Sequence, residues 1–155
     1  MHEQRCLLRG YLRYVLSFTA QNFQPYITTQ FLGSVLTDHF VFRRRFLLAL
    51  ETNLVYTAIG SHAHVNVFCK EKVSTYIWGS NTSRPYGQLA PSVCHTCGLP
   101  FPWTTSRTSG NTTVLKCKKC GIATSMTFQM PDDLQPLQAR PCHKWYERRL
   151  VDNQK

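Results

Sequence analysis

Two short cysteine turns constrain this chain more than any other feature of its sequence. Residues 94–98 (CHTCG) and 117–121 (CKKCG) each place two cysteines three positions apart and a glycine directly after them. The CxxC step lets two sulfur atoms converge on one ion, and glycine accepts the positive φ angle that such a turn requires. The nineteen residues between the two steps fit a spacing that is typical of zinc sites. We therefore expect one Zn²⁺ ion, bound by Cys94, Cys97, Cys117 and Cys120.

The expected metal site is structural rather than catalytic. Four thiolates complete the tetrahedral shell of zinc and leave no open position where the ion could activate water. A redox-active dithiol, disulfide bonds and an iron–sulfur cluster stay open as alternatives. A redox dithiol favours a single CxxC step between a strand and a helix, whereas both steps here lie beside predicted strands.

Residues 94 to about 130 resemble a zinc ribbon, the small three-stranded module found in transcription factors, RNA polymerase subunits and ribosomal proteins. The resemblance rests on the two CxxCG turns and on strand-like segments at residues 102–107, 112–117 and 123–130. It implies a three-stranded fold and one structural zinc bound by the four cysteines, and it implies no particular activity. The first 90 residues resemble no family known to us.

The N-terminal part of the chain is predicted to be helical and then to form strands. Apolar residues recur with helical spacing at residues 7–16, 26–36 and 40–51, and Asp38 is the predicted N-cap of the third helix. Segments rich in β-branched and aromatic residues then predict an antiparallel meander, with strands at residues 54–60, 64–69 and 73–79. The predicted fold class is therefore α+β.

Changes in composition divide the chain into four parts. We predict an α+β region over residues 1–78, a linker rich in Gly, Pro, Asn and Ser over 79–92, the zinc ribbon over 93–130, and a tail over 131–155. The tail contains several prolines and ends in a basic, aromatic segment, for which we predict a short helix at residues 141–150.

The chain is basic, which favours anionic partners such as nucleic acid. Lys and Arg number 18 against 8 Asp and Glu, a formal net charge of +10. The predicted ribbon mixes aromatic residues and cations as single-strand-binding surfaces do. The candidate contact residues are Phe101, Trp103, Arg107, Lys116, Lys118 and Lys119. Trp103 has a second interpretation, as a core residue beside the metal. The densest positive run, at residues 43–45, is interpreted as a solvated helix face or an anion-binding site.

The sequence offers no catalytic constellation. The eight acidic residues are scattered along the chain, and P-loop, GxGxxG, GxSxG and HExxH patterns are absent. We therefore expect no catalytic residues and favour a protein that is not an enzyme. The leading interpretation is a zinc-binding protein that contacts nucleic acid. The alternatives are a protein-interaction or structural module, and a C-terminal accessory fragment of a larger enzyme.

The expected location is intracellular, in the nucleus or the cytoplasm. No segment approaches the apolar length of a membrane span, so we expect no membrane partner. Arg9 and Arg13 interrupt the N-terminal apolar run, which argues against a secretory signal. The regular spacing of Arg5, Arg9 and Arg13 leaves a mitochondrial transit peptide open as an alternative.

Overall fold

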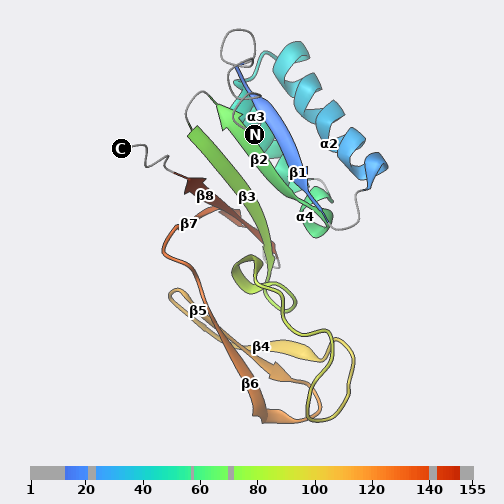
Figure 1. Cartoon of the computed structure of the whole chain (residues 1–155), viewed down its shortest axis with the longest axis vertical. Coiled ribbons are helices and arrows are strands. Elements are labelled where there is room, and N and C mark those ends of the chain that lie inside the picture. The colour runs from blue at the N-terminus through green and yellow to red at the C-terminus, as the bar shows by residue number, and fades with distance from the viewer. Residues whose placement is uncertain (1–12, 21–23, 57, 70–71, 140–142, 151–155) are drawn as a thin grey trace, which may run out of the picture. The chain divides into compact units, whose positions relative to one another are not determined.

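The structure, a computed structural model, describes residues 13–20, 24–56, 58–69, 72–139 and 143–150. It contains helices and two sheets, one of five strands in the order β1-β2-β3-β8-β7 and one of three strands in the order β4-β5-β6 (Figure 1). The chain divides into two compact units: a first unit of residues 1–76 with 147–155, and a second unit of residues 77–146. The predicted α+β class is confirmed at this level, although the strands outnumber those predicted.

The first unit combines helices with antiparallel strands. Its described elements are β1 (Val15–Thr19), α2 (Pro25–Leu36), η1 (Thr37–Val41), α3 (Phe46–Tyr56), α4 (Ile59–His62), β2 (His64–Cys69), the first residues of β3 (Lys72–Ser80) and the last residues of β8 (His143–Leu150). β2 pairs antiparallel with both β1 and β3, so Val65 lies opposite Phe18 on one side and Tyr76 on the other. Strand alternation buries Val65 and Val67, as the prediction of strands at 64–69 and 73–79 requires.

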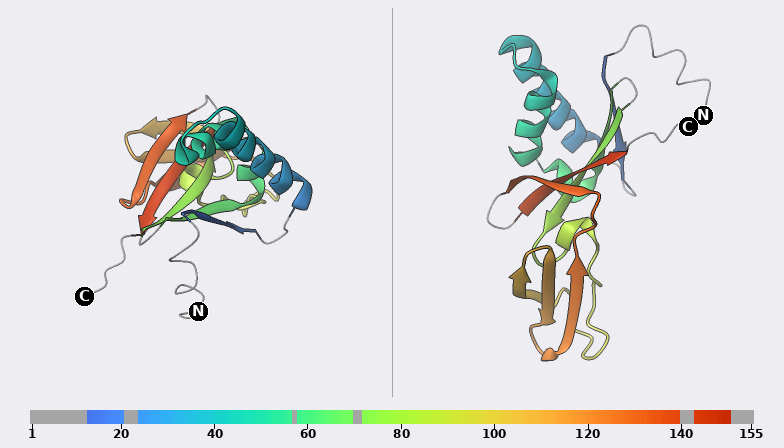
Figure 2. Two further views of the ribbon diagram at one scale, coloured as in Figure 1. Left: turned by 90° about the horizontal axis from the view of Figure 1, so that it is seen from above. Right: turned by 90° about the vertical axis from the view of Figure 1, so that its left-hand side faces the viewer.

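Helices α2 and α3 cover one face of these strands (Figure 2). Pro25 begins α2, and proline suits this position because an N–H in the first turn would have no hydrogen-bond partner within the helix. The helix buries Phe31 and Val35, four positions apart, and the ring of Phe18 on β1 meets Phe31 edge-on at 6.1 Å. The helix predicted at residues 26–36 is therefore confirmed.

One predicted helix and one predicted strand in the first unit are wrong. Val15–Thr19 form strand β1, so the helix predicted over 7–16 is wrong at its end, and its residues 7–12 lie outside the described part of the chain. Residues 54–60, predicted as a strand, lie partly at the end of α3 and partly in α4. Leu50 and Leu54 are both fully buried one helical turn apart, and this packing overrides the local strand propensity.

Residues 37–45, which we call the corner, replace the predicted start of the third helix. Thr37–Val41 continue from α2 as one π-helical turn (η1), and Arg43 then has a φ of 56°, which a right-handed helix cannot contain. Helix α3 therefore begins at Phe46 rather than at residue 40. The carboxylate of Asp38 does not cap it and instead accepts hydrogen bonds from Arg44 and Asn53.

The second unit carries the three-stranded antiparallel sheet. Its strands are β4 (Trp103–Ser109), β5 (Thr112–Cys117) and β6 (Gly121–Gln129), which confirms the three strands predicted in this region. Alternate residues of β5, namely Thr113, Leu115 and Cys117, are buried. The sheet therefore has one covered face and one face that is open.

Residues 79–92, predicted as a linker, hold ordered contacts inside the second unit. Pro85–Gly87 form a 3₁₀ turn (η2). The ring of Tyr86 is buried, and its hydroxyl accepts a hydrogen bond of 3.0 Å from Thr113 on β5. Gly87 has a φ of 80°, and a Cβ atom there would collide with the side chain of Ile77, so only glycine fits this turn. As a domain boundary the linker stays a prediction.

The C-terminal tail departs most from prediction. It forms two strands, β7 (Leu134–Ala139) and β8, so the helix predicted at 141–150 is wrong over 143–150, and β7 was not predicted. β8 lies between β3 and β7 in the sheet. The hydroxyl of Ser74 donates to Glu147 across 73 positions of sequence. A strand whose partner is so distant carries little local signal of its conformation.

Candidate metal centre

Two turns place the four cysteines. In the first turn, residues 94–98, the N–H of Gly98 donates to the carbonyl of Cys94 at 2.9 Å. In the second turn, residues 117–121, Cys117 ends β5 and Gly121 begins β6. Gly98 and Gly121 have φ angles of 70° and 66°, the left-handed conformation predicted for the glycine after each CxxC step.

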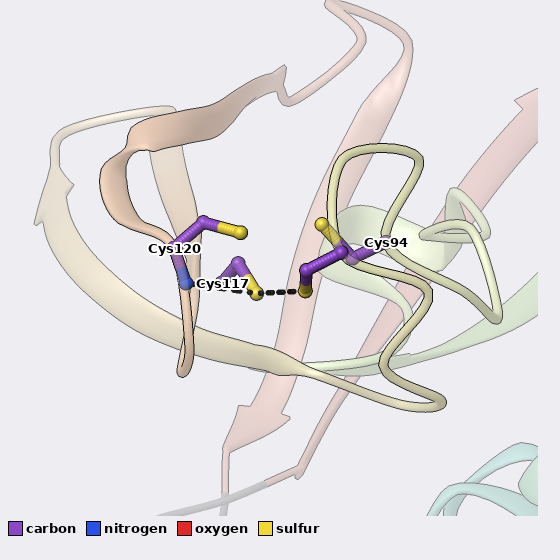
Figure 3. A group of neighbouring side chains, drawn as sticks. Cys94, Cys117 and Cys120 are labelled. Carbon is purple, nitrogen blue, oxygen red and sulfur yellow. Dashed lines mark hydrogen bonds between the residues drawn. The ribbon is translucent and has the colours of Figure 1, made fainter.

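The four sulfur atoms converge from these turns (Figure 3). Those of Cys94, Cys97, Cys117 and Cys120 all lie within 4.8 Å of one another, and all four cysteines are free of disulfides. The sulfurs of Cys97 and Cys117 are 3.7 Å apart, far beyond the S–S bond of about 2.05 Å in a disulfide. Sulfurs bound at about 2.3 Å to one tetrahedral zinc would lie about 3.8 Å apart. The group can therefore hold one metal ion.

A small core surrounds this group. Cys94 and Cys117 are buried together with Trp103 and Leu115, while Cys97 and Cys120 are half-buried at the edge of the cluster. The indole N–H of Trp103 donates to the carbonyl of Pro91 at 2.6 Å, which fixes the ring beside the cysteines. The apolar shell limits the access of water to the sulfur atoms.

Hydrogen bonds within the group separate the pKa values of its thiols. Desolvation raises the pKa of Cys94, but hydrogen bonds from the backbone at Cys97 and Thr96, and then from neighbouring thiols, outweigh it and lower the pKa to about 6. Hydrogen bonding with Cys97, followed by desolvation, raises the pKa of Cys120 to about 12. These shifts make Cys94 the more acidic thiol and Cys120 the less acidic one, and any thiol that binds a metal ion must release its proton.

Sequence analysis missed two hydrogen bonds, each of which connects one of the cysteine turns to another segment of the second unit. The hydroxyl of Thr124 on β6 donates to that of Thr96 in the first turn at 3.2 Å. The N–H of Lys118 in the second turn donates to the carbonyl of Pro102 at 2.8 Å. The alternation of β6 was the available signal, because it places Thr124 on the buried face of the strand.

The four basic candidates lie on the open face of the sheet and in the second turn. The register of β4 and β5 sets Arg107 opposite Val114, so its side chain shares a face with Val114 and Lys116. This face is opposite the one on which Leu115 and Cys117 are buried. Lys118 and Lys119 are exposed between the cysteines of the second turn.

The two aromatic candidates differ in exposure. Trp103 is 4% exposed and belongs to the core beside the cysteines, so no base can stack on its ring. Phe101 is 77% exposed and has a φ of 44°, a costly conformation for an aromatic residue. Its N–H donates to the carbonyl of Ser92 at 2.7 Å, which helps to hold that conformation. The ring of Phe101 is therefore available to a partner in solution, whereas the ring of Trp103 is buried in the core.

Comparisons of this chain with protein-family models, with curated proteins and with solved structures gave no match. Its class is therefore defined by the geometry of the site, a group of four cysteines that can hold a metal ion. No helix in the described part of the chain combines the length and the hydropathy that a membrane span needs.

Proposed function

We propose that this chain is a zinc-binding protein whose four cysteines hold one structural Zn²⁺ in a zinc-ribbon module, and that the module contacts nucleic acid. Four thiolates are the donor set of many structural zinc sites. The separation of 3.7 Å between two of the sulfurs agrees with such a site. The core of the module is small, and metal binding would supply the folding free energy that so small a core lacks.

The charge around the cysteines carries the proposal for nucleic acid. Between Glu71 and Asp132 the sequence has no acidic residue, whereas residues 93–130 contain four cations: Arg107, Lys116, Lys118 and Lys119. These cations outnumber the two net negative charges of a zinc ion with four thiolates. No acidic side chain within residues 93–130 competes for them, so they are available to phosphate groups. Phe101 adds an exposed ring on which a base can stack.

The test is fluorescence anisotropy of the zinc-loaded full chain with labelled single- and double-stranded oligonucleotides across a salt series. If all four cations meet phosphates of a single strand, the slope of log affinity against log salt is about −2.8. The affinity then falls roughly 50-fold between about 50 and 200 mM salt. Binding that ignores salt, or that is weaker than micromolar at low salt, refutes the proposal.

A matched pair of variants separates this surface from the general positive charge. Lys118→Gln removes a candidate contact and should lower the steepness of the salt dependence by about 0.7. Lys72→Gln removes a charge that is also exposed, from β3 in the first unit, and should leave the slope unchanged. Equal effects of the two changes would show that binding is not directed by the cysteine module.

A further inference from the structure

The corner (residues 37–45) exposes a concentrated apolar surface. Phe40, Val41 and Phe42 are 62%, 67% and 64% exposed. Further large apolar side chains are exposed at the adjoining helix ends: Leu36, Leu47 and Leu48. Single exposed apolar residues are ordinary on protein surfaces, but a continuous run bordered by charged residues marks an interaction site.

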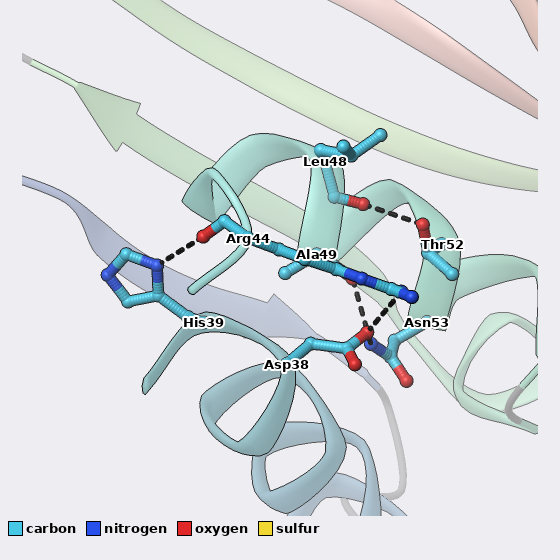
Figure 4. Close-up of polar contacts among 7 residues, drawn as sticks. All are labelled: Asp38, His39, Arg44, Leu48, Ala49, Thr52 and Asn53. Carbon is cyan, nitrogen blue, oxygen red and sulfur yellow. Dashed lines mark hydrogen bonds and ion pairs between the residues drawn. The ribbon is translucent and has the colours of Figure 1, made fainter. Parts of the chain in front are cut away.

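Hydrogen bonds hold the corner in one conformation (Figure 4). The carboxylate of Asp38 accepts from Arg44 at 3.2 Å and from Asn53 on α3 at 2.9 Å. The ring N–H of His39 donates to the carbonyl of Arg44 at 2.8 Å. The backbone N–H of Phe42 donates to Thr37 at 3.2 Å. These bonds connect the two sides of the exposed run, so its side chains are displayed on an ordered backbone.

The corner also presents positive charge beside its apolar residues. Asp38 is the only acidic residue between positions 24 and 50, and its ion pair with Arg44 neutralises it. Arg43 and Arg45 are exposed, and within the described part of the chain their side chains form no hydrogen bond or ion pair. A partner of this surface must therefore offer apolar contact and negative charge side by side.

We propose that the corner docks on an anionic membrane surface. Phe40, Val41 and Phe42 enter the boundary between headgroups and acyl chains, while Arg43 and Arg45 meet the anionic headgroups. Phe40 and Val41 end the π-helical turn and Phe42 follows it directly, so the three apolar residues are continuous with the cations at positions 43 and 45. The acyl boundary of a membrane offers apolar contact without a shaped pocket, and anionic headgroups supply negative charge directly beside it. A nucleic acid would stack on a phenylalanine but offers no comparable contact to Val41.

This site belongs to the first unit and does not depend on the metal centre of the second. It departs from the sequence-based expectation of no membrane partner, which considered only segments that span a bilayer. Docking at the interface needs a short apolar surface and adjacent cations, and it needs no span.

The test is flotation of the zinc-loaded full chain with phosphatidylcholine vesicles that contain or lack phosphatidylserine. We expect binding to the anionic vesicles only. Phe42→Ser should weaken that binding about tenfold or more, and Arg45→Gln about fivefold. Leu89→Ser, at a residue that is 70% exposed in the second unit, and Lys72→Gln are the matched controls and should bind as the parent does. All four positions are exposed, and an unchanged thermal midpoint verifies folding.

A tryptophan probe distinguishes insertion from adsorption. Phe42→Trp should show fluorescence that shifts to the blue on anionic vesicles and is quenched by lipids brominated on the acyl chain, in excess of the signal from the parent's three tryptophans. Absence of vesicle binding overturns the proposal, as does an equal loss in the Leu89→Ser control. Binding that needs the arginines but not Phe42 also overturns it, because it is surface adsorption. A Phe42→Ser variant that loses oligonucleotide binding while vesicles are never bound overturns it in favour of nucleic acid.

Discussion

Truncation of Leu115 tests whether metal binding and folding of the cysteine module are one event. Leu115 is fully buried on β5, two residues before Cys117, in the same cluster as Trp103 and Cys94. Replacing such a leucine by alanine costs about 2–5 kcal/mol of folding free energy. If the module folds only with its metal, this cost is taken from the free energy of binding. A loss of about 2.8 kcal/mol then weakens zinc binding by about 100-fold.

The assay is a competition titration of the full chain against a chromophoric zinc chelator at constant pH. Leu115→Ala should bind zinc about 100-fold more weakly than the parent. Val114→Ala is the control, because Val114 is half-buried on the opposite face of the same strand and should change the affinity only slightly. If Leu115→Ala binds zinc as tightly as the parent, the module is folded without metal and the reasoning is refuted.

Three further changes test the packing and electrostatics of the two units. Gly87→Ala sets a methyl group against Ile77 at a φ of 80° and should destabilise the protein by about 2 kcal/mol or more in urea unfolding. Tyr86→Phe removes the acceptor of the buried Thr113 hydroxyl and should cost about 1–2 kcal/mol in the same assay. Burial, and then nearby carboxylate charge, raises the pKa of Glu51. Because folding raises this pKa, the protonated carboxyl stabilises the folded state. That stability is fully present below the unfolded pKa and is lost as the pH rises through the folded pKa. Glu51→Gln should therefore raise the thermal midpoint at pH 7 and leave it unchanged below the ordinary glutamate pKa.

Each of these changes has a result that would contradict it. Gly110→Ala is the control for the turn, since Gly110 has a φ of 54° and open space around it. If both alanine variants lose the same stability, the collision with Ile77 has no effect. A Tyr86→Phe variant as stable as the parent would show that Thr113 finds another partner. If Glu51→Gln shifts the thermal midpoint equally at pH 7 and below the ordinary glutamate pKa, the shift does not come from the charge of Glu51.

The cysteine module was predictable because its signals are local. Each CxxCG turn fixes its own geometry, and Gly98 and Gly121 have the positive φ angles that the motif requires. Strand β5, which leads into the second turn, alternates buried and half-buried residues, a period that the sequence displays directly. Within this module, the choice between core and surface for Trp103 needed the structure, because both positions suit an aromatic residue.

The first unit and the tail were harder to predict because distant contacts decide them. Strand β1 exists through its pairing with β2, whose register joins Val15 to Phe68. Strand β8 lies beside β3 in the sheet, far from it in sequence. The corner was misread because Asp38 has the residue type of a helix cap, yet its carboxylate binds Arg44 and Asn53. Local sequence patterns do not predict such partners.

Native mass spectrometry of the full chain tests the central claim most directly. We expect a mass that exceeds the metal-free chain by one zinc ion, and its loss after treatment with a chelator. Cys117→Ser should abolish the bound zinc, whereas Cys69→Ser, at a free cysteine outside the four-cysteine group, should keep it. A chain that binds no zinc, or a Cys117→Ser variant that retains it, would contradict the claim that these four cysteines hold a structural zinc.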